Sequence, residues 1–259
     1  MAGRPPFVIQ REGDRHVRVE ADGTVTKTFA GQNAQEEANR EADRLRRFRA
    51  ALDGVDGATC PALLHVDGPP WRVNMARVPG VALSDRLAGS LLTDAELGAI
   101  AAVLAAGVTC YVRTFAEPYY DFHLRNVVSD AATNTLAFVD FGVPAELEGA
   151  LPMLDGHDPL EVSLGNLVGS TVFEAARPRS VRLPRANRAQ SFHLAREVVD
   201  SFMGSTVTSS GVAAVARLSY RQSARRGSLP RRLWYLARGD LAGQASRAIA
   251  RICGERPLA

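Results

Sequence analysis

Three side chains with metal-binding and proton-accepting groups stand close together in the sequence. Asp121 and Asn126 are five positions apart, and Asp140 begins an Asp-Phe-Gly tripeptide. Residues 126–129 and 135–139 are separated by a polar turn, a pattern that predicts a short β-hairpin leading directly into Asp140. Carboxylate and amide oxygens are ligands that Mg²⁺ prefers, and a carboxylate can accept a proton from a hydroxyl group. The segment is therefore a candidate for metal-assisted acid–base chemistry.

Lys27 is a second candidate, because it is the only lysine of the chain among 31 basic residues. A lysine is a compact point charge, whereas an arginine is a broad planar fork, so a tight phosphate pocket can require the lysine. Residues 24–29 are rich in β-branched side chains and follow an Asp-Gly turn, which predicts a strand. Side chains alternate along a strand, so Lys27 shares its face with Val25 and Phe29 and needs a partner for its charge.

The next segment offers such a partner. Residues 33–52 contain few helix breakers, and Leu45, Phe48 and Leu52 follow Glu41 at helical spacing. Glu41 therefore lies within the apolar stripe of a predicted helix. We expect Glu41 to pair with Lys27, with Glu37 as the second choice. The alternative is a Glu41 that is only half-buried at the surface.

In this order the motifs resemble the protein-kinase-like superfamily, and in particular its branch of bacterial aminoglycoside phosphotransferases and lipopolysaccharide kinases. Asp121-x-x-x-x-Asn126 resembles the catalytic loop of that superfamily, and the tripeptide at Asp140 resembles its magnesium-binding motif. Lys27 and Glu41 resemble its lysine–glutamate pair. The resemblance implies that Asp121 accepts the acceptor's proton, that Asn126 and Asp140 bind Mg²⁺, and that Lys27 holds the phosphates of ATP.

Two further segments resemble the same branch. Residues 71–87 are similar to its hinge, which implies that backbone groups from Ala76 to Val78 face the adenine; an ordinary strand and turn is the alternative. The spacing Asp121-x-His123 also resembles that branch, in which the histidine lies near the transferred phosphate. A purely structural role is the alternative for His123.

The chain also departs from ordinary protein kinases. Tyr119 and Tyr120 stand where histidine and arginine usually precede the catalytic aspartate, residues 7–20 contain only Gly13 in place of a glycine-rich loop, and no Ala-Pro-Glu motif follows Asp140. We therefore expect an ATP-dependent kinase that acts on a hydroxyl of a small molecule, a glycan or a lipid-linked acceptor. The alternatives are a compact bacterial-type Ser/Thr protein kinase and a catalytically inactive scaffold that binds an anionic partner.

The expected fold is α+β with two lobes. Residues 1–78 would form an N-lobe with a small antiparallel sheet and one helix, and residues 79–259 a mainly helical C-lobe. The apolar segment 97–115 predicts a buried central helix in front of the catalytic loop. Its longest uncharged run, residues 97–112, is too short for a membrane span.

Composition and charge indicate the cellular location and the kind of surface at the end of the chain. The chain has 259 residues, of which 46% are hydrophobic, and three cysteines without metal-ligand spacing. The cysteine usage and the absence of a secretory pattern at residues 1–14 favour a reducing, cytoplasmic location. Residues 177–259 hold sixteen arginines against four acidic residues, so the end of the chain is strongly basic.

Two charged surfaces allow alternative interpretations. Arg217, Arg221 and Arg225 recur every four residues in a helix predicted over 210–226, which suits either a solvated face or docking at the inner face of an anionic membrane. A nucleic-acid partner is not expected, because no binding motif accompanies the charge. Acidic residues after the tripeptide either line a site for a cationic substrate or belong to a surface loop; they are Glu146, Glu148, Asp155, Asp158 and Glu161.

Overall fold

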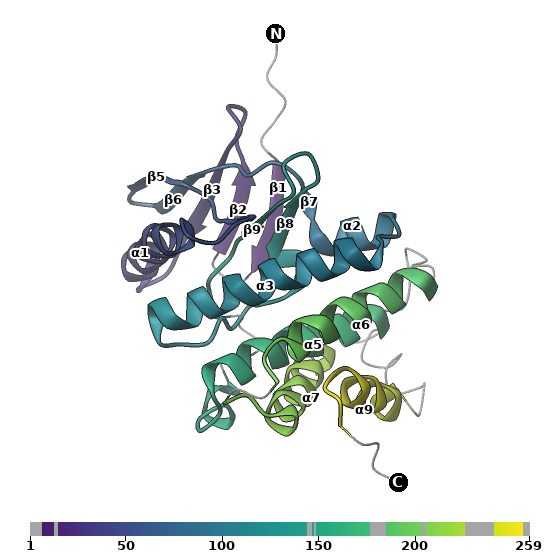
Figure 1. Ribbon diagram of the computed structural model, residues 1–259. Coiled ribbons are helices and arrows are strands. Elements are labelled where there is room, and N and C mark those ends of the chain that lie inside the picture. Colours follow the sequence, from purple (N-terminus) through teal and green to yellow (C-terminus); the bar gives the residue numbers. More distant parts are fainter. Residues whose placement is uncertain are drawn as a thin grey trace.

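The computed structural model describes residues 7–12, 15–143, 147, 149–176, 185–203, 206–225 and 241–255. These residues form an α+β protein, with an antiparallel sheet near the N-terminus and a mostly helical remainder (Figure 1). The fold class expected from the sequence is confirmed at this level.

The N-terminal sheet has five antiparallel strands in the order β1-β2-β3-β6-β5. Their bounds are Phe7–Glu12 (β1), Arg15–Val19 (β2), Thr24–Phe29 (β3), Leu63–Asp67 (β5) and Trp71–Ala76 (β6). The predicted strand over 24–29 is confirmed as β3, which lies at the centre of the sheet. Because both neighbours of β3 are strands, the side chains of β3 are fixed in alternation to the two faces.

Helix α1 (Ala34–Leu52) packs against this sheet and confirms the helix predicted over 33–52 (Figure 1). Its apolar stripe is buried, with Leu45 and Phe48 at 1% and 0% exposure. Glu41 lies on the same stripe and is 5% exposed, so it is fully part of the packed face.

A second, smaller sheet lies between the N-terminal sheet and the helices. It has the order β4-β9-β8-β7, and its strands are Ala58–Thr59 (β4), Val81–Ala82 (β7), Val127–Asp130 (β8) and Thr135–Phe138 (β9). Strands β8 and β9 form the predicted hairpin, with Val127 paired to Phe138. Strand β4 pairs in parallel with β9, so the segment after α1 is joined to the hairpin.

The helical part is arranged around α3 (Asp94–Phe115), which crosses the middle of the molecule (Figure 1). A capping box between Thr93 and Glu96 starts this helix, because the two side chains satisfy backbone groups at its first turn. The other helices in the described part of the chain are α2 (Leu83–Gly89), α5 (Pro159–Ala176), α6 (Arg185–Asp200), α7 (Ser209–Arg225) and α9 (Leu241–Ile252), with short 3-10 turns at Leu124–Asn126 and Leu151–Met153.

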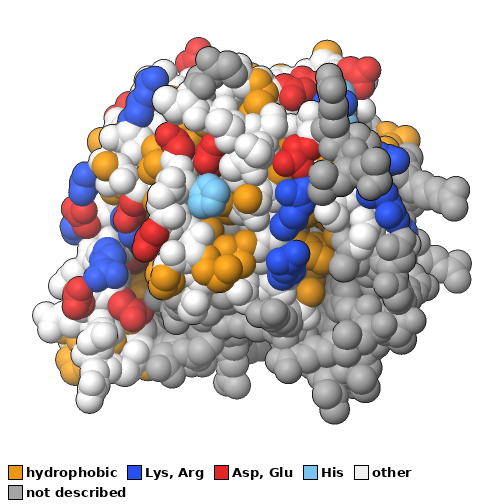
Figure 2. Space-filling model, turned by 90° about the horizontal axis from the view of Figure 1, so that it is seen from below, with side chains coloured by type: hydrophobic (Ala, Val, Ile, Leu, Met, Phe, Trp, Pro, Cys, Tyr) orange, Lys and Arg blue, Asp and Glu red, His pale blue; other side chains and the backbone are white. Residues whose placement is uncertain are grey.

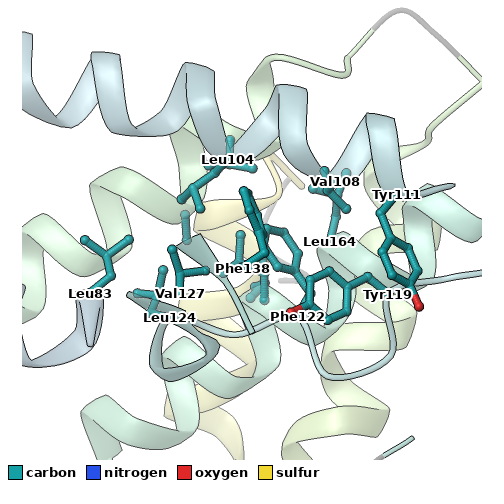
Figure 3. Close-up of a cluster of buried hydrophobic side chains, with 14 of the residues drawn as sticks. Leu83, Leu104, Val108, Tyr111, Tyr119, Phe122, Leu124, Val127, Phe138 and Leu164 are labelled. Carbon is teal, nitrogen blue, oxygen red and sulfur yellow. The ribbon is translucent and has the colours of Figure 1, made fainter. Parts of the chain in front are cut away.

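By length and composition α3 could cross a membrane, but here it packs against α1, α5 and α6. Its inward residues Leu104 and Val108 are both fully buried (Figure 3). A Cβ at Gly107 would stand 2.1 Å from the Phe138 ring, so only glycine allows α3 to approach β9 this closely. The helix therefore packs closely against the β8–β9 hairpin.

Candidate functional site

Lys27 projects from the centre of β3 into the space between the sheet and α1. Its Nζ lies 3.0 Å from Glu41 Oε1 and 2.8 Å from Asp140 Oδ1. The side chains of Lys27 and Glu41 are about equally buried, at 5% and 6% exposure, while that of Asp140 is 23% exposed. The first-choice partner expected from the sequence is therefore in contact with Lys27, and a second carboxylate comes from Asp140, just after β9.

Burial and charge act in opposite directions on this cluster. Burial alone would lower the pKa of Lys27, but the carboxylates of Asp140 and Glu41 reverse the effect, and its pKa lies above the ordinary value. Burial would likewise raise the pKa of Asp140, yet the Lys27 ammonium and its hydrogen bond hold that pKa below its usual range. The lysine is therefore charged, and Asp140 is ionised, at neutral pH.

Asp140 follows β9 with a backbone φ of 59°, the left-handed region that residues other than glycine seldom adopt. The next side chain, Phe141, is buried at 2% exposure. Its ring packs against Phe48 of α1 at 5.4 Å between centroids and against Tyr119 at 5.5 Å. These contacts fix the turn that aims the Asp140 carboxylate at Lys27.

The loop before the hairpin brings the other polar residues together. Asn126 Nδ2 donates to Asp121 Oδ2 at 2.6 Å, and His123 Nε2 lies 3.1 Å from Asp121 Oδ1. The backbone carbonyl of Asn126 accepts a hydrogen bond of 2.9 Å from the N–H of Val139. Because Val139 precedes Asp140, this bond joins the loop directly to the Lys27 cluster.

His123 contacts Asp121 and lies near Asp140. Its Nδ1 is buried and has no hydrogen-bond partner among the residues that the structure describes. The geometry thus places His123 beside the two key carboxylates, and its role near a transferred phosphate stays a prediction.

Tyr119 takes over a structural task in the same loop. It is fully buried in the hydrophobic cluster (Figure 3), and its hydroxyl donates to the Val139 carbonyl at 2.6 Å. Its ring stacks on Tyr111 of α3 with centroids 4.7 Å apart. Burial raises the pKa of Tyr119 well above its usual value, so the hydroxyl stays a donor. The residue therefore ties the loop that carries Asp121 to the strand end that carries Asp140.

Two polar residues of α5 support the loop and were not anticipated from the sequence. Ser163 Oγ accepts a 2.9 Å hydrogen bond from the N–H of Tyr119, and Asn166 Nδ2 donates to the Tyr120 carbonyl at 2.8 Å. Both side chains are buried, at 0% and 4% exposure. A buried polar residue needs a partner, so polar residues at buried helix positions are the signal that points to such a role.

The expected hinge connects the two sheets. The N–H of Ala76 donates to the Ala62 carbonyl at 2.8 Å, so it is already used by the sheet. Beyond Ala76 the chain turns at Gly80, where φ is 112° and a Cβ would stand 2.3 Å from the Ser129 carbonyl oxygen. The stretch from Ala76 to Val78 therefore borders both sheets, and its contact with adenine remains a prediction.

The oxygen donors of the site suit a hard divalent cation. The described part of the chain contains no cluster of three His, Cys, Asp or Glu residues that could hold a metal by itself, and the three cysteines are free thiols. Asp140 and Asn126 would supply one carboxylate and one amide oxygen, a donor set that leaves positions for phosphate oxygens and water, as Mg²⁺ prefers. The residues present therefore fit Mg²⁺, and its binding here remains a prediction.

The acidic residues after Gly142 divide into different groups. Glu161 is buried and accepts hydrogen bonds from the N–H and hydroxyl of Thr208 at 2.9 and 2.6 Å, and those bonds outweigh burial, so its pKa is lowered. Asp158 accepts from the N–H of Leu160 and the hydroxyl of Thr206. These two residues join α5 to the start of α7. Asp155 is exposed, whereas positions 146 and 148 lie outside the described residues.

The arginine stripe of α7 is partly engaged inside the protein. Arg217 forms an ion pair with Glu255 and lies 3.4 Å from the Ser246 hydroxyl of α9, whereas Arg221 is exposed. The side chain of Arg225 lies outside the described residues. Figure 2, which views this side of the molecule, shows acidic, basic and hydrophobic side chains interspersed among the described residues. Docking of this face on an anionic membrane remains a prediction.

Comparisons with known proteins leave the site to be judged by its geometry. No protein-family model matches the chain, and no curated protein matches it. The function is therefore inferred from the contacts among Lys27, Glu41, Asp121, Asn126 and Asp140.

Proposed function

We propose that the protein is an ATP-dependent phosphotransferase with a two-lobed, protein-kinase-like fold. Its acceptor would be a hydroxyl of a small molecule, a glycan or a lipid-linked compound. The observation that carries the proposal is the buried Lys27, which contacts Glu41 on α1 and Asp140 at the end of β9 at the same time. A buried lysine with two carboxylates, beside a second carboxylate–amide pair, is far more charge than a structural core needs.

The arrangement suits transfer of a γ-phosphoryl group, which depends on positioning and charge neutralisation. Lys27 would bind the ATP phosphates, and Glu41 would hold Lys27 in place. Asp140 and Asn126 would hold Mg²⁺, which would neutralise charge on the phosphates when bound. Asp121 would accept the proton of the attacking hydroxyl, and its carboxylate is already oriented by Asn126 and His123.

Two features favour a small acceptor over a protein. Tyr119 and Tyr120 replace the histidine and arginine of ordinary protein kinases, and the tyrosine hydroxyl at 119 is used internally. Position 120 therefore lacks the arginine that contacts the activating phosphate in ordinary protein kinases. Residues 143–158 alone separate the tripeptide from α5, which leaves a short segment for binding a peptide.

Nucleotide binding tests the proposal directly. The affinity for ATP would be measured by calorimetry with Mg²⁺ and with EDTA, for the wild-type protein and for Asp140→Asn. We expect Mg²⁺ to strengthen ATP binding by the wild-type protein and to have little effect on Asp140→Asn. Asp56→Asn is the matched control, because Asp56 is exposed and lies before β4, away from the Lys27 cluster. Absence of ATP binding by the wild-type protein would contradict the proposal.

A further inference from the structure

Arg44 lies on α1 next to Glu41 and makes two polar contacts across the fold. Its Nη1 donates to the Phe141 carbonyl at 2.9 Å, and its Nη2 lies 2.5 Å from Glu117 Oε1. The side chain is only 13% exposed. Arginines on a helix usually extend into solvent, so burial of this one between two acceptors indicates a specific task.

The two acceptors belong to the two segments that carry the site. Phe141 follows Asp140 directly, and Glu117 stands four residues before Asp121 in the connection after α3. The guanidinium fork can hold two acceptors at once in a fixed relative position. Arg44 therefore joins α1, the Asp140 turn and the segment leading to Asp121 through one side chain.

The Asp140 turn needs such a restraint. Its left-handed backbone is an uncommon conformation for an aspartate, and such conformations persist only where the surroundings hold them. The Phe141 ring is fixed by aromatic packing, and the N–H of Gly142, in the peptide group that follows, bonds the Asp140 carboxylate. The bond from Arg44 to the Phe141 carbonyl fixes that peptide group as well.

We infer that Arg44 is a positioning residue that holds α1 against the Asp140 turn and so keeps Glu41, Lys27 and Asp140 in contact. Its consequence for catalysis rests on the proposed phosphotransferase function. The contact itself is a property of the ligand-free protein and can be tested without nucleotide. A neighbouring arginine provides the comparison, because Arg40 is exposed and its ion pair is with Glu36 on its own helix.

The first measurement is hydrogen–deuterium exchange of the full, ligand-free chain. In Arg44→Ala we expect backbone amides of residues 139–142 to exchange at least about tenfold faster than in the wild type, because local opening no longer breaks the Arg44 contacts. Arg44→Lys should show a smaller increase, since an ammonium can hold only one of the two acceptors well. Glu117→Gln should also show a smaller increase. Arg40→Ala should match the wild type.

The second measurement is the Mg²⁺-dependent part of the ATP affinity in the same variants. We expect the increase in ATP affinity caused by Mg²⁺ to be about tenfold smaller in Arg44→Ala than in the wild type. The ATP affinity in EDTA should stay near the wild-type value. Equal exchange at 139–142 in Arg44→Ala and Arg40→Ala would overturn the inference. The inference would also be overturned if exchange in Arg44→Ala rose equally in all peptides and rose as much in Arg44→Lys. If the wild type fails to bind ATP, the phosphotransferase proposal fails, and the exchange data still decide the role of Arg44.

Discussion

Replacing Lys27 by methionine tests the charge cluster most simply. Methionine nearly matches the length of the lysine side chain, so the change removes the charge without leaving a large cavity. Glu41 and Asp140 would then face each other without the ammonium that now lies 3.0 and 2.8 Å from them. The two carboxylates repel, and the buried one cannot reach solvent.

The expected cost follows from the burial of the two partners. Removing one member of a buried ion pair destabilises a protein by about 3–5 kcal/mol. Because the Asp140 side chain is 23% exposed, we expect the lower end, about 3 kcal/mol at pH 7. For a chain of this size that corresponds to a fall in Tm of about 6–12 °C.

The pH dependence gives the prediction a sign. The pKa of Asp140 is lowered in the folded wild type, so its stabilising effect is present above the unfolded pKa of about 3.9 and is lost as pH falls through the folded value. The pKa of Lys27 is raised, so its contribution is present below about pH 10 and is lost only at higher pH. In Lys27→Met the carboxylates can relieve their repulsion by binding protons, so the variant loses less stability in acid.

Urea unfolding at a series of pH values measures this. The difference between the wild type and Lys27→Met should be widest near neutral pH and should narrow below about pH 5. Arg40→Met is the matched control, because its ion pair with Glu36 is exposed and should cost less than about 1 kcal/mol. A Lys27→Met cost below about 1 kcal/mol at pH 7, or a cost independent of pH, would refute the reasoning.

Four other perturbations address the same account. Lys27→Arg should lower kcat/KM for ATP at least about tenfold, because the guanidinium is broader than the ammonium pocket; steady-state kinetics with unchanged kcat/KM would contradict this. Asp121→Ala should lower kcat about 100-fold or more while the protein stays folded, and near wild-type turnover by the folded variant would exclude it as the base. Tyr119→Phe should cost about 1–2 kcal/mol in urea unfolding, because the Val139 carbonyl loses its donor; an unchanged unfolding midpoint would show that water replaces the hydroxyl. Co-sedimentation should show binding to anionic vesicles that weakens with salt and with Arg221→Ala, whereas equal binding to neutral vesicles would leave the arginines as a solvated face.

Local patterns in the sequence predict much of the fold and part of the site. Strand β3, helix α1 and the β8–β9 hairpin were expected from alternation, helical spacing and a polar turn, and each lies within one or two residues of its predicted bounds. The contact between Lys27 and Glu41 was also expected, because each charge lies on the apolar face of its own element and needs a partner.

Contacts between distant segments could not be predicted in the same way. Arg44 is one of several arginines in α1, and nothing local distinguishes it from its exposed neighbours. Its partners Phe141 and Glu117 are 97 and 73 positions away in the sequence, so only the folded structure brings them into contact with it. The pairing of Arg217 with Glu255 is of the same kind, and it changes an arginine expected on a free face into one held by α9. The parallel pairing of β4 with β9 likewise depends on the packing of α1 and α3.

The central claim is that the Lys27 cluster and the Asp121 loop transfer phosphoryl groups. The most direct measurement incubates the protein with γ-labelled ATP and Mg²⁺, against pools of hydroxyl-bearing metabolites, glycans and lipid-linked sugars and, separately, a peptide array. We predict label transfer to one small-molecule or glycan pool, none to peptides, and none by Asp121→Ala or Asp140→Asn. Transfer to peptides alone would instead favour a protein kinase. Failure to bind Mg²⁺-ATP, together with no transfer to any pool, would contradict the claim and leave a kinase-like scaffold.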